Sequence, residues 1–558
     1  MRKSDAVEDF LGSFGKWQFR STLLIYLVKI PSAWFMACLI FTAKSPMPGE
    51  IFCSPPIGIE LNDTNFWINS IHKESFNRIE NEESYDYCYV YQDAYLNYSV
   101  REDEATRESI PCVKFQHQTV YASIINQYEL LCSREALVAL SQSFHLLGVL
   151  IGGIIAFYML KKCSPRETML VGMISQIPLG LATGYAPNYI LHLIFRCSVA
   201  ATCSLMCIGI MIVSDITAGK YRIISICLFE QFWSIGVILL PAVSSWWKSW
   251  TTVYIAISIP TFSLIILYYW IPDSPRWLLK HNRVADAKKV LLDAANFNGK
   301  TDYNEDELDK ELSLLAEEMQ KHPSEPTLLS IWKGTLTFKI RLFAAHIGWS
   351  IYLMTYFALL LHVRAMGRKY LEINTIIAGT SEIIGTFIGL ILILHTTQKW
   401  LWTSLLNILA SIISISAIFV PDTIAPTERM MIYMATAMTA KMTVSTSLSI
   451  FITSMSEIVP KEKRKTCNYS GVTCSRTLVM IAPFIGFFVI YGQLVPQVIT
   501  SVMNIFASLL VAICIQTSRT LPHKTKIYFV DQDPDDDDIL SSKLADGIKS
   551  KNKYLLIV

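Results

Sequence analysis

Charged side chains interrupt several long apolar runs of this sequence, and they are its strongest candidates for chemistry. Arg476 follows Cys474 and Ser475 in one run, and Glu382 lies in another. A charged group in hydrocarbon costs at least about 2.5–3.5 kcal/mol on insertion scales, so it needs a partner or a water-filled cavity. The guanidinium of Arg476 offers a planar fork that suits a carboxylate, sulfate or phosphate group. These residues predict recognition of a small charged molecule.

Three further ionic side chains, Lys29, Glu230 and Lys441, complete this set. A cavity lined by all five would carry a net charge of +1, which favours an anion or a zwitterion over a bare cation. Glu382 could pair with Arg476 in the empty site, or receive the ammonium group of a zwitterion whose carboxylate lies at Arg476. The alternatives are structural ion pairs without a substrate role, a gate function for Lys441, and snorkelling of Lys29 to the membrane surface.

Aromatic residues accompany the charges: Phe232 and Trp233 in one run, and Tyr356 and Phe357 in another. Their rings could hold apolar groups or cations over their faces, although core packing or lipid contact would explain each of them equally well. The histidines of the apolar runs are isolated, and the sequence has no phosphate-binding glycine loop, catalytic triad or zinc-ligand spacing. We therefore expect no metal, no cofactor and no enzymatic activity.

The elements that must position these residues are membrane-spanning helices. Of the 558 residues, 52% are hydrophobic and 17% are charged, and the mean hydropathy is +0.37. Apolar runs extend for about 20 residues, the length that crosses roughly 30 Å of hydrocarbon. The sequence predicts an all-α membrane protein with twelve spans. They are expected near 21–43, 136–158, 168–186, 189–213, 223–246, 251–271, 338–362, 371–394, 400–420, 428–456, 467–490 and 493–516.

The spans form two sets of six, separated by a charged stretch with short amphipathic helices. This plan resembles the major facilitator fold, in which two six-helix halves rock around a central site. The expected parts are a cytoplasmic N-terminus (1–20), a first half (21–271) that includes an extracellular loop (44–135), a cytoplasmic linker (272–337), a second half (338–516) and an acidic cytoplasmic tail (517–558).

The long loop between the first two spans carries signs of an extracellular position. It contains glycosylation sequons at Asn62 and Asn97. Four cysteines in or beside this polar segment indicate two disulfides, with three connectivities open. These cysteines are Cys53, Cys88, Cys112 and Cys132.

The distribution of basic residues gives the orientation. Ten lysines and arginines lie in the short loops expected inside and five in those expected outside, so both termini should be cytoplasmic. No cleavable signal peptide is evident. The overall charge is only +2, without a basic stripe, which argues against nucleic acid as a partner. The expected partners are the lipid bilayer and a small organic ion, and the oligomeric state is left open.

The segment Pro272–Leu279, which reads PDSPRWLL, follows the sixth span. It resembles the P-[ED]-S-P-R-W-L signature of solute carrier family 22, the organic cation and anion transporters of the major facilitator superfamily. Further matches cover nearly the whole chain. They are Asp5–Gly15, Tyr128–Cys132, Phe195–Arg196, Ile259–Phe262, Glu457, Pro460, Arg464 and Leu521–Pro522.

The resemblance implies a plasma-membrane carrier that alternates access, with spans one, four, seven and ten lining its path. Arg476 matches a position where anion-transporting relatives carry Arg and cation-transporting relatives carry Asp. Glu382 matches an acidic position of cation-transporting relatives, whereas anion transporters often place Lys one turn later, where this chain has Thr386. Lys441 matches a position that usually holds Lys or Arg. The two sets of cues point in opposite directions.

The gate loops depart from the family pattern. Lys161 stands where the loop between spans two and three usually has Asp, and the equivalent loop 395–399 has lost its acidic residue too. The gate candidates are Lys162, Arg166, Asp215, Arg222, Glu457 and Arg464.

We therefore expect a transporter of small organic ions that works by alternating access, with a carnitine-like zwitterion or an anion as the favoured substrate. The alternatives are an organic cation transporter and a non-transporting membrane sensor or receptor built on the same fold, which the altered gate loops would favour.

Overall fold

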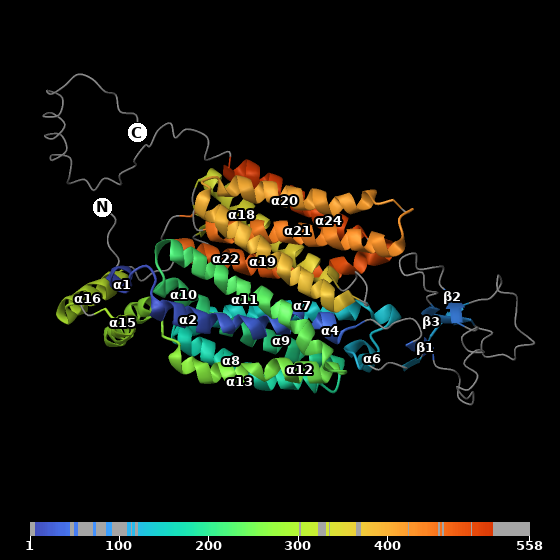
Figure 1. The fold of residues 1–558 in the computed structure, drawn as a ribbon, viewed down its shortest axis with the longest axis horizontal. Helices are drawn as coiled ribbons and strands as arrows, with labels where there is room; N and C mark the ends of the chain where they lie inside the picture. Colours follow the sequence, from blue (N-terminus) through green and yellow to red (C-terminus); the bar gives the residue numbers. More distant parts are fainter. Residues whose placement is uncertain are drawn as a thin grey trace, which may run out of the picture. The chain divides into compact units, whose positions relative to one another are not determined.

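The structure is a computed structural model of the chain (Figure 1). Asn62, Asn97, Glu457 and the predicted tail 517–558 lie outside the residues that it describes. The described residues are 6–44, 50–53, 71–73, 85–91, 109–112, 114–117, 121–300, 303–321, 331–333, 335–363, 370–421, 423–455, 458–459, 463–492 and 494–516.

The first half consists of long helices with local interruptions. The first span is divided into three helical pieces, and the sixth span is interrupted at Pro260, which has no N–H for the helical ladder. A capping box between Ser164 and Glu167 begins α8. The elements are α2 (Lys16–Leu27), α3 (Lys29–Ala37), α4 (Leu39–Thr42), α7 (Ala136–Met159), α8 (Pro165–Gly184), α9 (Tyr189–Met206), α10 (Gly209–Ile216), α11 (Gly219–Ser245), α12 (Trp250–Ser258), α13 (Pro260–Leu267) and η5 (Tyr268–Trp270).

The second half also consists of long helices with local interruptions. Its penultimate span is interrupted just before Pro483, where α22 ends and α23 begins. The elements are α18 (Leu336–His362), α19 (Leu371–His395), α20 (Lys399–Ser416), η8 (Ala417–Phe419), α21 (Pro426–Ser454), α22 (Arg464–Val479), α23 (Ala482–Ile485), η11 (Gly486–Tyr491), α24 (Val495–Val511) and η12 (Ala512–Gln516).

Nine helical segments within the described ranges are long and apolar enough to cross a membrane. Three other helices, α8, α21 and α22, were expected as spans but are not among these nine. They nevertheless pack inside the bundle, α8 against α9, α21 against α19 and α20, and α22 against α18. A multi-pass helical membrane protein is therefore established, and twelve spans stay a prediction.

The two halves meet along α11 and α19 and along α7 and α22 (Figure 1). Gly379 of α19 permits the first of these contacts, because a Cβ at this position would lie 2.5 Å from the side chain of Ile238 on α11. An ion pair also joins the halves near the loop: Lys44 Nζ lies 3.0 Å from Glu372 Oε1.

The loop after the first span contains two small antiparallel sheets, which the sequence analysis did not predict. One pairs β1 (Ile51–Cys53) with β5 (Phe115–His117), and the other has the order β2 (Ile71–Lys73), β3 (Tyr85–Tyr91), β4 (Ser109–Pro111). The short helices α6 (Ile124–Tyr128) and η4 (Cys132–Arg134) lead into α7. Disulfides join Cys53 to Cys112 and Cys88 to Cys132, one of the three connectivities left open.

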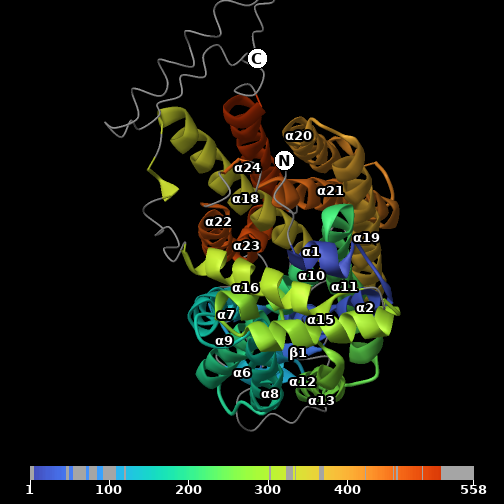
Figure 2. The same cartoon turned by 90° about the vertical axis from the view of Figure 1, so that its left-hand side faces the viewer.

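Four helices pack together at the opposite end of the bundle, which we call the linker end. They are α1 (Ala6–Leu11), α14 (Pro275–Lys280), α15 (Val284–Asn298) and α16 (Glu305–Lys321). They share an apolar core that includes Val7, Trp277, Leu279, Leu291 and Leu312. Figure 2 shows α15 and α16 lying across the helices of the first half.

Candidate functional site

The charged candidates lie near the middle of their spans, with Lys29 at the start of α3 and Arg476 in the last turn of α22. Each stands 11 to 15 residues from the first residue of its helical segment. At about 1.5 Å per residue this is a depth of roughly 16–22 Å, close to the centre of a bilayer. Charges at this depth require partners or water.

Lys29 of α3 and Glu230 of α11 form one ion pair, with 2.9 Å between Nζ and Oε1. The Lys29 ammonium also lies 4.5 Å from the centre of the Phe229 ring and 5.7 Å from that of Trp233. The Lys29 side chain is 11% exposed, whereas that of Glu230 is 53% exposed. This pair therefore combines a covered cation with an open carboxylate.

Lys441 of α21 and Glu382 of α19 form the second ion pair, with 2.7 Å between Nζ and Oε2. Their side chains are 0% and 8% exposed, and the Tyr356 ring covers the ammonium at 4.7 Å. The structure thus pairs Glu382 with Lys441 rather than with Arg476, so the first of the two arrangements considered for Glu382 is not the one observed. Because both side chains are almost fully covered, we call this second pair the sealed pair.

Arg476 of α22 reaches from the second half to the first. Its Nη1 donates a hydrogen bond of 3.0 Å to the carbonyl oxygen of Val149 on α7. Gly153, one turn further along α7, leaves room for the guanidinium, because a Cβ there would lie 2.7 Å from Nη1. The charge of Arg476 is attracted by Glu230 and repelled by Lys29, so these three groups share one electrostatic environment.

Three of the four aromatic candidates lie between the two ion pairs. Tyr356 and Phe357 of α18 make an edge contact with centroids 5.1 Å apart, and Phe357 makes another with Trp233 of α11 at 6.5 Å. Phe232 points elsewhere and packs against Tyr26 in the core of the first half. Trp233, Tyr356 and Phe357 therefore connect the halves beside the charges, and Phe232 does not.

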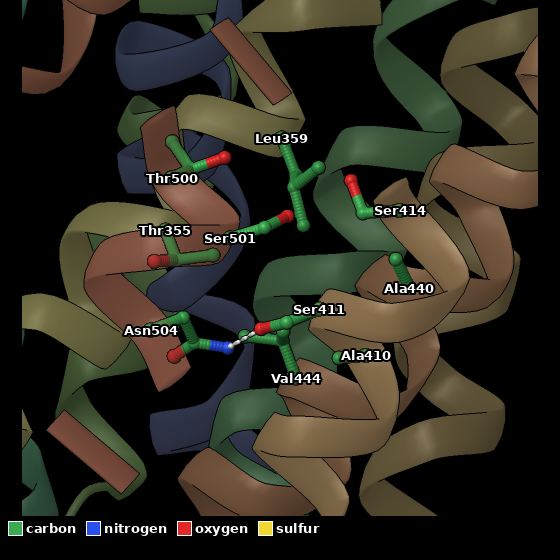
Figure 3. A pocket seen from close by; sticks show the side chains of 10 residues that line it. All are labelled: Thr355, Leu359, Ala410, Ser411, Ser414, Ala440, Val444, Thr500, Ser501 and Asn504. Carbon is green, nitrogen blue, oxygen red and sulfur yellow. Dashed lines mark hydrogen bonds between the residues drawn. The ribbon is translucent and has the colours of Figure 1, made fainter. Parts of the chain in front are cut away.

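A small cavity lies within the second half, between α18, α20, α21 and α24 (Figure 3). Its lining is mostly small and polar, and one hydrogen bond crosses its wall from Asn504 Nδ2 to Ser411 Oγ, at 3.1 Å. None of the five charged candidates lines it, although Thr355 and Ala440 are sequence neighbours of Tyr356 and Lys441. It is separate from the charged site.

The gate candidates take several positions at the linker end. Arg166 lies over the Tyr268 ring at 4.4 Å, the Asp215 carboxylate accepts a hydrogen bond from Ser274, and Lys162 is exposed. These contacts stay within the first half and the linker, and Arg464 likewise bonds within the second half, to the carbonyl of Val459 at 3.2 Å. Their role in gating stays a proposal.

Glu8 of α1 is an unpredicted member of this region. Its carboxylate forms ion pairs with Arg222 of α11 and with Arg276 of α14, the latter at 2.9 Å. The signature segment adds a hydrogen bond of 2.9 Å from Trp277 Nε1 to the carbonyl of Leu160 at the end of α7. The N-terminal helix and the linker are thus fastened to the first half.

Sequence reasoning missed four contributors to these sites: Glu8, Phe229, the Val149 carbonyl and Gly153. A backbone carbonyl has no signal in a sequence. Gly153 follows Gly152, and this pair of glycines in an apolar run could have indicated a close approach. Among the described residues, no group of three or more His, Cys, Asp or Glu side chains could hold a metal ion.

The helical fold is that of a membrane transporter, and the comparisons with known proteins agree. Residues 119–487 match the sequence family Major Facilitator Superfamily, so the chain belongs to it. Solved structures of the xylose transporter XylE share the fold. The proton:xylose symporter XylE bound to 6-bromo-6-deoxy-D-glucose has a TM-score of 0.57 at 12% identity, over 88% of this chain and 94% of that one. A partially occluded inward open conformation of XylE from E. coli has a TM-score of 0.56 at 12% identity, over 91% and 98%.

Curated relatives confirm the resemblance to solute carrier family 22. The chain is 25% identical to an organic cation transporter protein of Drosophila melanogaster over 91% of this chain and 90% of that protein. It is 24% identical to solute carrier family 22 member 7 of Rattus norvegicus over 64% and 68%. It is also 24% identical to member 3 of Mus musculus over 74% and 75%. The chain is a multi-pass transporter of this type and not an enzyme.

The contacts of Glu8 give a prediction for stability against pH. Burial alone would raise the pKa of this carboxyl, but hydrogen bonds and charge from Arg222 and Arg276 outweigh it and hold the pKa below the ordinary 4.5. A lowered pKa stabilises the fold above the ordinary value, and that contribution is lost as pH falls through the folded value. Glu8→Gln should lower the melting temperature of purified protein at pH 7, and the difference from wild type should shrink as pH falls below about 4.5. Glu135→Gln, at an exposed position, is the control; a difference that is constant with pH would contradict the assignment.

Proposed function

We propose that this transporter carries small organic anions or zwitterions, including carnitine-like molecules. The observation that supports this proposal is the different pairing of the three cations among the five charged candidates. Lys29 and Lys441 each have a carboxylate within 3 Å, at 2.9 and 2.7 Å. The guanidinium of Arg476 instead bonds to a neutral carbonyl. The central site therefore has one positive charge in excess, which an anionic group of the substrate would neutralise.

Arg476 is also suitably placed for a transport cycle. It belongs to the second half and contacts α7 of the first. When two halves rock around a central site, the distances between groups on opposite halves change most. A substrate anion at Arg476 would be held between moving bodies, so its binding could favour one conformation over the other.

An organic cation is the second candidate, because Glu230 presents an open carboxylate. Two relatives also carry organic cation transport in their names. Against this, Glu230 is already neutralised by Lys29, and Arg476 would repel a bare cation. We therefore place the anion and the zwitterion first.

For location, we propose the plasma membrane, with both termini in the cytoplasm and the disulfide-bearing loop outside. The excess of basic residues in the short loops at the linker end supports this orientation. The disulfides and the sequons of the loop support it independently.

Reversing the charge at Arg476 should reverse the selectivity. Arg476→Asp changes the net charge of the central site from +1 to −1, so uptake of organic carboxylates should fall at least about tenfold and uptake of organic cations should rise. Uptake of a mixed panel of labelled ions by expressing cells measures this. Arg134→Asp, at an exposed position, is the control for the charge change itself. Unchanged uptake of every ion in the panel would show that Arg476 is not part of the binding site.

Gly153→Ala offers a milder test of the same contact. The new Cβ would lie 2.7 Å from Nη1 and force the guanidinium to shift, while Ala is tolerated well in a helix. The KM for carboxylate uptake should rise several-fold with normal amounts of protein at the cell surface. Gly486→Ala, where a Cβ meets nothing within 4 Å, is the matched control. A KM equal to that of wild type would show that the guanidinium position is not critical.

Glycosylation tests the proposed orientation. Asn62→Gln and Asn97→Gln should each remove one glycan, seen as a step in electrophoretic mobility that glycosidase treatment abolishes. Asn468→Gln removes a sequon that lies at the linker end and should leave the mobility unchanged. A mobility shift for Asn468→Gln alone would show the reverse orientation.

A further inference from the structure

The ammonium group of Lys29 occupies a cation site that other side chains build. Its Nζ lies 2.9 Å from Glu230 Oε1 and faces the rings of Phe229 and Trp233 at 4.5 and 5.7 Å. A carboxylate combined with ring faces is a common way of binding a primary or quaternary ammonium group of a ligand. Here the bound cation belongs to a side chain of α3 and not to a ligand.

The open carboxylate of this site faces the second half of the protein. Glu230 is three residues from both Cys227 and Trp233, so all three share one face of α11. Cys227 packs with Ile393 of α19, and Trp233 contacts Phe357 of α18. The 53% exposure of the Glu230 side chain therefore opens into the space between the halves and not toward lipid.

The sealed pair differs in this respect. Glu382 is only 8% exposed and its partner Lys441 is fully covered, so a substrate would have to break a buried ion pair to reach either. An open carboxylate is a more accessible receptor, and Glu230 is also the one that attracts Arg476.

We propose that a zwitterionic substrate binds with its carboxylate at Arg476 and its ammonium group at Glu230, where it replaces the Lys29 ammonium. This inference rests on the proposed function and narrows it to zwitterions. Lys29 can withdraw because its ammonium is carried on a flexible four-carbon stem. In the empty transporter Lys29 keeps Glu230 neutralised, so no unpaired carboxylate is left at mid-depth.

This exchange makes Lys29 an internal competitor of the substrate. A competitor that occupies the site reduces the apparent affinity of the ligand, and its removal restores that affinity. Lys29 and Glu230 should therefore have opposite effects when they are replaced one at a time. A purely structural ion pair would give effects of the same sign.

The test uses two labelled compounds of equal shape. One is 4-(trimethylammonio)butyrate, a zwitterion, and the other is 5,5-dimethylhexanoate, in which carbon replaces the charged nitrogen. Uptake is measured in expressing cells, with surface biotinylation to correct for the amount of transporter. Wild type should take up the zwitterion in preference to its isostere.

Three variants separate the roles. Glu230→Gln should lower uptake of the zwitterion about tenfold without lowering that of the isostere. Lys29→Gln should lower the KM for the zwitterion several-fold. The double variant K29Q/E230Q keeps the net charge of the central site at +1 and should transport both compounds alike. This result would exclude a change of net charge as the cause of the preference for the zwitterion. Glu135→Gln, at an exposed position, should match wild type.

The outcomes distinguish this inference from the proposed function. If Glu230→Gln lowers uptake of both compounds equally, or Lys29→Gln lowers both, the pair is structural and the ammonium site is wrong. In another outcome, Arg476→Asp abolishes uptake of the isostere, but Glu230→Gln changes uptake of the zwitterion and of the isostere equally. The proposed function then stands, and only this inference fails. If neither compound enters cells that express wild type, both fail.

Discussion

The high cost of an uncompensated charge in hydrocarbon constrains the centre of this protein. Five ionic side chains lie roughly 16–22 Å along their helices, too deep to reach the membrane surface from a packed interior. The structure meets the constraint in three ways: a sealed ion pair, an open ion pair, and an arginine that bonds to a backbone carbonyl. Each of these contacts also joins two helices.

The sealed and open pairs have different consequences for function. Lys441 and Glu382 connect α21 to α19 within the second half and leave little surface for a ligand. Lys29 and Glu230 connect α3 to α11 within the first half, with the carboxylate facing the other half. The aromatic contact of Trp233 with Phe357 lies between them. A carboxylate can therefore exchange its ion-pair partner more easily in the first half. This exchange would take place next to the guanidinium of Arg476, which belongs to the second half.

Much of the fold could be predicted from the sequence, because apolar runs of about 20 residues and a specific signature after the sixth span are strong signals. Most helix positions agree within three residues, apart from the earlier starts of the first and fifth spans. The interruptions of the first span and the small sheets of the loop were not predicted. Short strands without a repeated apolar pattern give little signal. Of the two breaks in the first span, Pro31 marks the one at Val28, whereas the one at Cys38 has no proline or glycine beside it.

The pairing of the charges could not be predicted in the same way. Glu382 was considered with Arg476, but the partner is Lys441. Which side chains meet depends on the rotation of each helix about its axis, and a membrane helix that is apolar on all sides carries no periodic pattern to fix that rotation. The same limit applies to Phe232 and Trp233, which are adjacent in sequence but face different neighbours.

The ion pair of Lys44 and Glu372 has a consequence for the cycle of this carrier. The two residues belong to different halves and stand where the first span ends and α19 begins, beside the disulfide-bearing loop. A movement that separates the two halves beside the loop would pull them apart. Their side chains are 16% and 36% exposed, so dissolved salt can weaken the attraction between them. The balance between the conformations open to either side should then depend on ionic strength, and raising it should favour opening beside the loop.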